Sequence, residues 1–387
     1  MSKYGFDTVI DRRGTNSLKY DFARERGKPD GLLPMWVADM DFAAPPEVLE
    51  ELRKTVNFGV FGYSEVKADY YTAAANWFLS RFGFGFGPAD VVKTPGVVFA
   101  LALAVKAYTL PGDAVLIQTP VYYPFFEVIQ NNGRKVAANP LVYKDGAYSI
   151  DFDDFERKII ESGARLFILC SPHNPVGRVW TRAELEQIRT VCKNRGVTVV
   201  SDEIHCDFVY PGHTHTAYGT LDPDAVICTS PSKTFNLAGL QTANIIIKNA
   251  ALRKKFKAEL AASGYSQLNA PGLAATERAY TDGAGWLKEL LAYLGGNVAF
   301  AREFLTARLP RVRLAPTEGT YLLWLDFSAY GLTQAELDAK IIRGARLWLD
   351  SGTIFGIDGA GFQRMNIACP RAILADALNR LAAGVGN

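Results

Sequence analysis

Lys233 is the residue of this sequence best suited to covalent chemistry. It lies in Ser230-Pro-Ser-Lys-Thr-Phe-Asn236, directly after the apolar run 225–229, which is typical of a buried strand, and a helical stretch is expected to follow. A lysine held at such a strand end is partly desolvated, which lowers the pKa of its amine and makes the free amine nucleophilic. The pattern predicts a lysine that forms a Schiff base. The alternative is an ordinary strand-end lysine that extends its amine into solvent.

Three further strands are expected to end near unusual side chains. The apolar runs 114–118, 165–170 and 197–201 are typical of buried strands, and the segments that follow them contain Tyr122, Asn174 and Asp202. In an open α/β sheet, ligands bind just beyond the carboxyl ends of the strands. We therefore expect an α/β fold in which these residues and Lys233 converge on one site.

The four residue types suit one cofactor. A lysine forms an imine with an aldehyde, and an acid paired with a pyridinium nitrogen keeps the ring an electron sink. An amide donates a hydrogen bond to the ring phenolate oxygen, and an aromatic side chain stacks on the ring face. Lys233, Asp202, Asn174 and Tyr122 thus predict a site for pyridoxal 5'-phosphate (PLP).

A phosphate site is expected at a helix N-terminus. Thr94-Pro-Gly-Val-Val-Phe-Ala-Leu101 places a glycine at a turn before an apolar helical run. The first N–H groups of a helix are free and bind anions, assisted by the helix dipole. We expect the PLP phosphate at the backbone of Gly96, Val97 and Val98, with hydroxyl groups added by Ser230 and Ser232. The alternative for both serines is an ordinary turn.

These blocks resemble a known family. From Trp36 to Asn366 the sequence resembles fold-type-I PLP-dependent enzymes, and within them the cystathionine β-lyase (C–S lyase) branch related to the class I and II aminotransferases. The blocks that carry the resemblance are Trp36-Val-Ala-Asp-Met-Asp-Phe42, Phe61-Gly-Tyr63, Ser171-Pro-His-Asn-Pro-Val-Gly177, Ser201-Asp-Glu-Ile-His205, Ser230-Pro-Ser-Lys-Thr-Phe-Asn236 and Arg364-Met-Asn366.

The resemblance implies two domains. The large PLP-binding domain would span 46–285 and contain a mostly parallel seven-stranded sheet flanked by helices. The smaller α/β domain would comprise 286–387, with 1–45 as an N-terminal segment packed against it. A cluster of helix-breaking residues at 281–285 marks the boundary, and a long amphipathic helix over 286–309 is expected to join the domains.

The resemblance also assigns site residues that spacing alone does not. Tyr63 would cross a homodimer interface to the cofactor phosphate of the other subunit, so that the active sites are shared. Tyr122 would stack on the ring and transfer a proton to the leaving group. His205 would lie beside the ring and hold the Asp202 carboxylate in place. The backbone near Ala38 would approach the substrate carboxylate; the alternative for 36–42 is a turn that leads into a helix at Pro45-Pro46.

Arg364 lies in the apolar run 361–367, where an unpaired charge would be costly. It should therefore have a carboxylate partner. One possibility is a structural salt bridge. The other, which the resemblance supports, is a bidentate clamp on the substrate α-carboxylate, where Asn174 would also contribute.

The resemblance implies α,β-elimination of L-cystathionine or a related thioether to a thiol (homocysteine), pyruvate and ammonia, as in EC 4.4.1.13 and methionine biosynthesis. Lys233 would remove the α-proton. Many class I and II aminotransferases carry tyrosine and arginine where this chain has His205 and Gln241, and both departures agree with the C–S lyase branch. An aminotransferase is the alternative, and a regulatory role through a protein partner is a third hypothesis.

The composition is typical of a globular protein. The 387 residues are 49% hydrophobic and 21% charged with a formal net charge of +2, so no nucleic-acid partner is expected. The longest apolar run, 97–105, is far shorter than the roughly 20 residues that span a bilayer, and no signal-peptide core is seen. The five cysteines are scattered and form no CxxC pair, which predicts a cytoplasmic protein without disulfides. His213 and His215 lie in an expected loop, so no metal site is predicted. No membrane segment is expected either.

Overall fold

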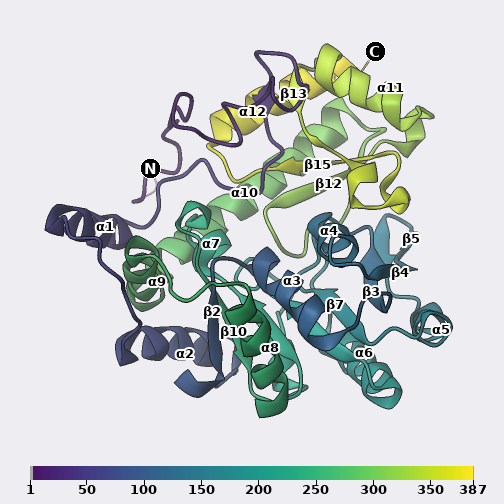
Figure 1. Ribbon diagram of the computed structural model, residues 1–387. Coiled ribbons are helices and arrows are strands. Elements are labelled where there is room, and N and C mark those ends of the chain that lie inside the picture. Colours follow the sequence, from purple (N-terminus) through teal and green to yellow (C-terminus); the bar gives the residue numbers. More distant parts are fainter. Residues whose placement is uncertain (1–2, 387) are drawn as a thin grey trace.

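A seven-stranded, mostly parallel sheet forms the centre of the larger part of the molecule (Figure 1). The computed structural model describes residues 3–386. Strand β10 is antiparallel to both of its neighbours, and the other neighbouring strands are parallel. In spatial order the strands are β2 (Val91–Thr94), β10 (Ala243–Ile247), β9 (Val226–Thr229), β8 (Thr198–Asp202), β7 (Leu166–Cys170), β3 (Ala114–Thr119) and β4 (Lys135–Pro140).

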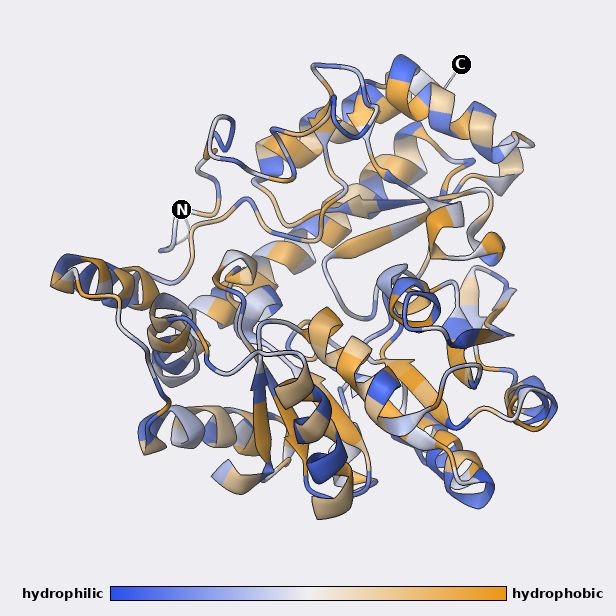
Figure 2. Ribbon diagram, in the orientation of Figure 1, coloured by the Kyte–Doolittle hydropathy of each residue, from blue (hydrophilic) through white to orange (hydrophobic). Residues whose placement is uncertain are grey.

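Helices cover both faces of this sheet because its central strands are apolar on both sides. Val115 and Ile117 pack in a core with α3, α4 and α8, whereas Leu116 packs on the opposite face with α2, α5 and α6. Figure 2 shows these strands largely in orange and the outward turns of α5 and α6 in blue. The helices are α1 (Pro46–Phe58), α2 (Ala68–Phe82), α3 (Val97–Tyr108), α4 (Pro124–Gln130), α5 (Phe152–Ser162), α6 (Arg182–Arg195), α7 (Pro231–Thr234), α8 (Ala250–Ala262), α9 (Ala270–Asp282), α10 (Ala284–Arg308), α11 (Gln334–Ala339) and α12 (Arg371–Val385).

A second, antiparallel sheet lies beside α10 and α12 (Figure 1). Its order is β11 (Arg313–Leu314), β12 (Leu322–Asp326), β15 (Phe362–Asn366) and β14 (Asp350–Ser351). The N-terminal segment joins this part of the chain, because β1 (Leu33–Pro34) pairs with β13 (Leu347–Trp348). The hairpin β5 (Val142–Lys144) and β6 (Ala147–Ser149) completes the strands. The expected α/β fold with a seven-stranded sheet and a smaller α/β part is thus confirmed.

Local sequence signals predict several of the helix boundaries. Helix α1 begins at Pro46, as the Pro45-Pro46 pair predicts, and α11 is capped by Thr333, whose hydroxyl accepts from the Glu336 N–H. Within the 281–285 cluster, Gly283 alone separates α9 from the 25-residue α10. The domain limits at 45 and 285 stay a prediction.

One local expectation is wrong. The helix expected after the lysine block is instead formed by the block itself, as the four-residue α7 with Ser230 as its N-cap. The Ser230 hydroxyl accepts from the Ser232 N–H (3.1 Å), which starts the helix early. Only a short 3₁₀ turn, Ala238–Leu240, then precedes β10.

The five cysteines are all buried and none forms a disulfide. Within residues 3–386, no helix is both long and apolar enough to cross a membrane.

Candidate active site

Eleven of the thirteen predicted site residues line one cavity of about 230 Å³ at the carboxyl ends of the parallel strands. Because β3, β7, β8 and β9 are parallel, the segments after them meet at one edge of the sheet. The eleven residues are Ala38, Gly96, Val97, Val98, Tyr122, Asn174, Asp202, His205, Ser230, Ser232 and Lys233. Arg364 and Tyr63 are described below.

Lys233 extends from α7 into this cavity. Its Nζ donates a hydrogen bond to the Ala38 carbonyl oxygen (2.6 Å). Burial lowers the pKa of the amine to about 8; nearby Arg364 acts in the same direction, and the carboxylates of Asp39 and Asp202 oppose it. The lysine is therefore desolvated, as its position after a buried strand predicts, rather than extended into solvent.

Asp202 ends β8 and is buried in the cavity. Burial raises the pKa of its carboxyl group to about 7, although the Ile204 N–H donates to Oδ1 (3.1 Å) and Lys233 is nearby. No ion-pair partner contacts this carboxylate within the described part of the chain. A cationic ring nitrogen would supply the missing charge and keep it ionised.

The predicted role of His205 as a holder of Asp202 stays a prediction. The carboxylate is held by the Ile204 N–H in the turn after β8, and the described structure contains no hydrogen bond from His205 to it. The His205 ring lies beside Tyr321, with centroids 5.6 Å apart, and its buried Nδ1 has no hydrogen-bond partner. His205 does line the cavity, so a position beside a bound ring stays a prediction.

An anion cradle closes one end of the cavity. Gly96 is the N-cap of α3, and the first intrahelical bond runs from the Ala100 N–H to its carbonyl oxygen (3.1 Å). The N–H groups of Val97 and Val98 precede that bond and have no acceptor within the helix. Ser230 and Ser232 line the same cavity from α7. Free backbone N–H groups thus face this space at the positive end of the α3 dipole, whereas the Ser230 hydroxyl already donates to the Thr242 carbonyl oxygen (2.6 Å).

Arg364 has the carboxylate partner that its position predicts. Its Nη2 forms an ion pair with Asp350 and donates to the Trp36 carbonyl oxygen (2.8 Å), and Nη1 donates to Asn174 Oδ1 (3.0 Å). Nε is buried without a partner. The structural salt bridge is therefore present. The clamp on a substrate carboxylate stays a prediction, which the contact with Asn174 at the cavity wall favours.

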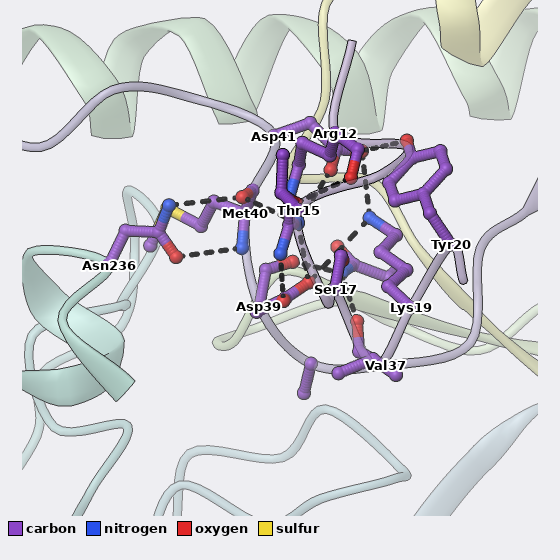
Figure 3. A network of polar contacts seen from close by, with 12 residues as sticks. Arg12, Thr15, Ser17, Lys19, Tyr20, Val37, Asp39, Met40, Asp41 and Asn236 are labelled. Carbon is purple, nitrogen blue, oxygen red and sulfur yellow. Dashed lines mark hydrogen bonds and ion pairs between the residues drawn. The ribbon is translucent and has the colours of Figure 1, made fainter. Parts of the chain in front are cut away.

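A polar network fixes the segment that carries Ala38 (Figure 3). Arg12 donates to Asp39 Oδ2 (2.6 Å) and Asp41 Oδ1 (2.9 Å), and the almost fully buried Lys19 donates to Asp41 Oδ2 (2.7 Å). The side chain of Asn236, from the lysine block, accepts from the Met40 N–H and donates to the Met40 carbonyl oxygen (both 3.0 Å). Asp39 and Asp41 are thus paired with cations of the N-terminal segment, and 36–42 leads into α1.

This network predicts a stability defect. In Asp41→Asn, the Lys19 ammonium, which is 1% exposed, loses its 2.7 Å partner and keeps only Asp39 at 3.9 Å. Leaving a buried charge without its partner costs about 3 kcal/mol, so the urea midpoint of unfolding should fall clearly. Asp11→Asn is the matched control, because the Arg13–Asp11 pair is exposed and its loss should leave the midpoint unchanged. Equal midpoints for the two variants would contradict the role of the network.

Several residues of the site escaped sequence reasoning. Tyr321 donates to the Ala38 carbonyl oxygen (2.9 Å), and Asn366 Nδ2 donates to the carbonyl oxygens of Val37 and Asp39 (both 2.6 Å). Asn366 lies two positions after Arg364 in one strand, so the two side chains point to the same face of that strand. This spacing could have identified Asn366 as a residue of the site. The cavity wall also includes Phe99, Cys170, Ile204, Gln241 and Thr242.

Tyr63 is not brought into the cavity of its own chain. Its side chain is 99% exposed, on a loop between α1 and α2. Three apolar neighbours, Phe58, Val60 and Phe61, are also more than 60% exposed. A loop with this much exposed apolar surface is typical of an interface between subunits. The contribution of Tyr63 to another subunit stays a prediction.

The residues present fit PLP. The cavity offers an amine of lowered pKa, a buried carboxylate without a cation, free backbone N–H groups and the Tyr122 ring. These groups suit an aldehyde, a pyridinium nitrogen, a phosphate and an aromatic face, respectively. The fold and the site together define a fold-type-I PLP-dependent enzyme.

Comparison with known proteins identifies the family. The model of the class I and II aminotransferase family matches residues 32–381, and this chain belongs to that family. It is 45% identical to cystathionine β-lyase PatB of Bacillus subtilis, over 98% of this chain and 99% of PatB. The PLP-containing crystal structure of cystalysin from Treponema denticola superposes with a TM-score of 0.95 at 36% identity, covering 99% of each chain. A PLP-bound C–S lyase from Staphylococcus hominis gives 0.93 at 34%, covering 100% and 99%.

Proposed function

We propose that this protein is a PLP-dependent cysteine-S-conjugate β-lyase that cleaves L-cystathionine or a related thioether to a thiol, pyruvate and ammonia. The observation that carries the proposal is the cavity around Lys233, in a chain that is 45% identical to a cystathionine β-lyase over nearly its whole length. The amino-acid substrates of the family agree with a cavity that is lined by Lys233 and by Asn174, which accepts a hydrogen bond from Arg364.

The cofactor would be held by residues that already line the cavity. The α3 N-terminus at Gly96, Val97 and Val98, with Ser230 and Ser232, would bind the phosphate. Asp202 would pair with the ring nitrogen, whose positive charge offsets the cost of burying the carboxylate. Tyr122 would stack on the ring, and Asn174 would donate to its phenolate oxygen. When bound, PLP supplies an electron sink for the electron pair left at the substrate Cα.

The protein groups divide the remaining tasks. Arg364 would bind the substrate α-carboxylate, supported by Asn174, with the backbone at Ala38 alongside. Lys233, whose amine has a pKa lowered to about 8, would take the proton from Cα as a general base. The Cβ–S bond then breaks, the thiolate leaves with a proton from Tyr122, and the remaining 2-aminoacrylate reacts with water to give pyruvate and ammonia.

The pKa of Lys233 predicts how the apoprotein captures PLP. Only the free amine attacks the aldehyde, so the capture rate should rise about tenfold per pH unit up to pH 8 and level off above it. With an ordinary lysine, whose pKa is about 10.4, the capture rate would still rise at pH 9. Borohydride reduction at timed intervals, followed by mass spectrometry of the Lys233 peptide, measures the rate. A rate that climbs steadily to pH 10 would contradict a desolvated amine.

Product analysis tests the reaction itself. The purified, PLP-loaded protein is incubated with L-cystathionine without any keto acid, and pyruvate, ammonia and free thiol are measured. Equal amounts of all three are expected. If pyruvate is absent and amino transfer appears only when a keto acid is added, the protein is an aminotransferase. If neither reaction occurs, a regulatory role through a protein partner becomes the hypothesis to pursue.

We also propose a homodimer with shared active sites, in the cytoplasm. The exposed loop with Tyr63 supports the dimer, and five buried thiols without a disulfide suit a reducing compartment. In this arrangement Tyr63 of each subunit reaches the phosphate bound by the other, so each site is completed by two chains.

Shared sites predict complementation between inactive variants. Tyr63→Ala and Lys233→Ala homodimers should each lose most activity. After denaturation together and refolding, half of the dimers are mixed, and each mixed dimer contains one intact site. One quarter of all sites are then intact, so roughly one quarter of the wild-type activity should return. A mixture that stays as inactive as its parents, despite mixed dimers seen by native mass spectrometry, would place Tyr63 outside the shared site.

A further inference from the structure

The helix that carries Lys233 is too short to fix its own orientation. Helix α7 has four residues, whereas an isolated helix becomes stable only at about 12–15 residues. Its first end is held by Ser230, whose hydroxyl donates to the Thr242 carbonyl oxygen (2.6 Å). Lys233 lies near the other end, so the direction of its side chain depends on what holds the residues beside it.

Thr234, the residue after Lys233, is held by a carboxylate. Its Oγ1 donates a hydrogen bond to Asp207 Oδ2 (2.8 Å). The two residues are almost completely buried, with Thr234 1% and Asp207 3% exposed. A hydrogen bond to a carboxylate is stronger than one between neutral groups, and the exclusion of water strengthens it further. Both residues lie outside the lining of the cavity around Lys233, so this contact supports α7 from outside the cavity.

Helix α2 in turn holds the Asp207 carboxylate. Arg81 forms an ion pair with it, with 2.6 Å between Nε and Oδ1, and Trp77 Nε1 donates to Oδ2 (3.3 Å). The Arg81 guanidinium also lies 4.8 Å from the centroid of the Trp77 ring. A buried carboxylate is costly without a cation, and this one has its cation. Asp207 is therefore a fixed acceptor, anchored on the 15-residue α2.

Asp207 also belongs to the turns that follow Asp202. Strand β8 ends at Asp202, and the Cys206 N–H then donates to the Glu203 carbonyl oxygen (3.0 Å), so the chain between the two aspartates is compact. One side chain thus connects the segment that carries Asp202 with the helix that carries Lys233. The aldehyde carbon and the ring nitrogen of PLP are a fixed distance apart, so the two groups that would bind them must keep a fixed separation as well.

We propose that Asp207 is a positioning residue for Lys233. By holding Thr234, it fixes α7 relative to the turn after β8, and the Lys233 amine is thereby kept in the cavity that Asp202 also lines. Asp207 acts through Thr234 and contacts neither cofactor nor substrate. The inference rests on the proposed role of Lys233 as the residue that binds PLP covalently.

Thr234→Val tests the contact, because it removes the hydroxyl and keeps the branched shape of the side chain. The apoprotein of this variant should capture PLP at Lys233 about tenfold more slowly at pH 8, since a hydrogen bond to a buried charge changes an equilibrium by about this factor. The rate is measured by timed borohydride reduction and mass spectrometry of the Lys233 peptide. Thr234→Ser keeps a hydroxyl and should stay within about twofold of the wild type.

Thr276→Val is the matched control. Thr276 is also buried, and its hydroxyl donates one hydrogen bond, to the Gly272 carbonyl oxygen (2.7 Å) within α9. This variant should capture PLP at the wild-type rate. An equal loss of capture rate in Thr276→Val and Thr234→Val would reduce the role of Thr234 to general stability and overturn the inference.

A double variant tests whether Asp207 and Thr234 act as one pair. In Asp207→Asn a neutral amide oxygen replaces the carboxylate and accepts more weakly, so the capture rate should fall here as well. If both substitutions act through the same hydrogen bond, Asp207→Asn/Thr234→Val should capture PLP no more slowly than the slower single variant. Losses that multiply in the double variant would show two independent effects and overturn the pairing.

The wild type separates this inference from the proposed function. If the wild type attaches no PLP at Lys233, the proposed role of Lys233 fails. If the wild type attaches PLP there, and Thr234→Val and Asp207→Asn do so at the same rate, only the positioning role of Asp207 is overturned.

Discussion

Lys233→Ala is expected to lower the rate of elimination by at least about 10³-fold, the largest effect of any single substitution in the site. The variant loses both the nucleophile that attaches the cofactor and the base that takes the α-proton. The phosphate cradle at Gly96 and the carboxylate of Asp202 remain, so the variant should still bind PLP without a covalent link.

Two measurements check this expectation. Borohydride reduction followed by intact-mass measurement should find one PLP attached per wild-type chain and none in Lys233→Ala, and pyruvate release should fall to the background. Lys193→Ala is the control, because that lysine is exposed on α6 and does not line the cavity. A Lys233→Ala protein that retains PLP covalently attached would remove the basis of the assignment.

Arg364→Ala is expected to lower kcat/KM about 100-fold or more, mainly through a higher KM. The substitution removes the proposed carboxylate clamp. It also leaves Asp350 buried without the cation that pairs with it, so stability should fall as well. The affinity for PLP should change little, because the phosphate cradle lies on α3 and α7.

A double variant separates these two effects. In Arg364→Ala/Asp350→Ala the unpaired carboxylate is gone, so the midpoint of unfolding should recover while KM stays high. If Arg364 served only as the partner of Asp350, KM would recover together with stability. Full recovery of kcat/KM in the double variant would therefore restrict Arg364 to its structural salt bridge.

The centre of the fold and of the site was predictable from the sequence because its signals are local. Each of β3, β7, β8 and β9 is a short apolar run followed by a turn, and parallel strands bring their carboxyl ends together. Lys233 and Asp202 could therefore be placed in one cavity without knowing any side-chain contact. The Gly96 turn before an apolar helix predicted the free N–H groups in the same way.

Contacts between distant loops were not predictable. Nothing near Arg364 in the sequence identifies Asp350 as its partner, since the contact depends on the pairing of β14 with β15. The Arg12 and Lys19 contacts with Asp39 and Asp41 likewise depend on how two irregular segments fold over each other. The contact of the Ile204 N–H with Asp202 Oδ1 was not predictable either, because it depends on the geometry of the turn after β8.

The contacts of Arg364 and Asn366 with 36–39 set an order for assembly during synthesis. Arg364 bonds the Trp36 carbonyl oxygen and Asn366 that of Val37, across 328 and 329 positions of sequence. The parallel strands leave the ribosome long before β15, so the segment with Ala38 must wait for the last stretch of the nascent chain. In chains that stop before β15, the segment 36–39 would not be held over the cavity around Lys233. These chains would therefore be cleaved early by proteases.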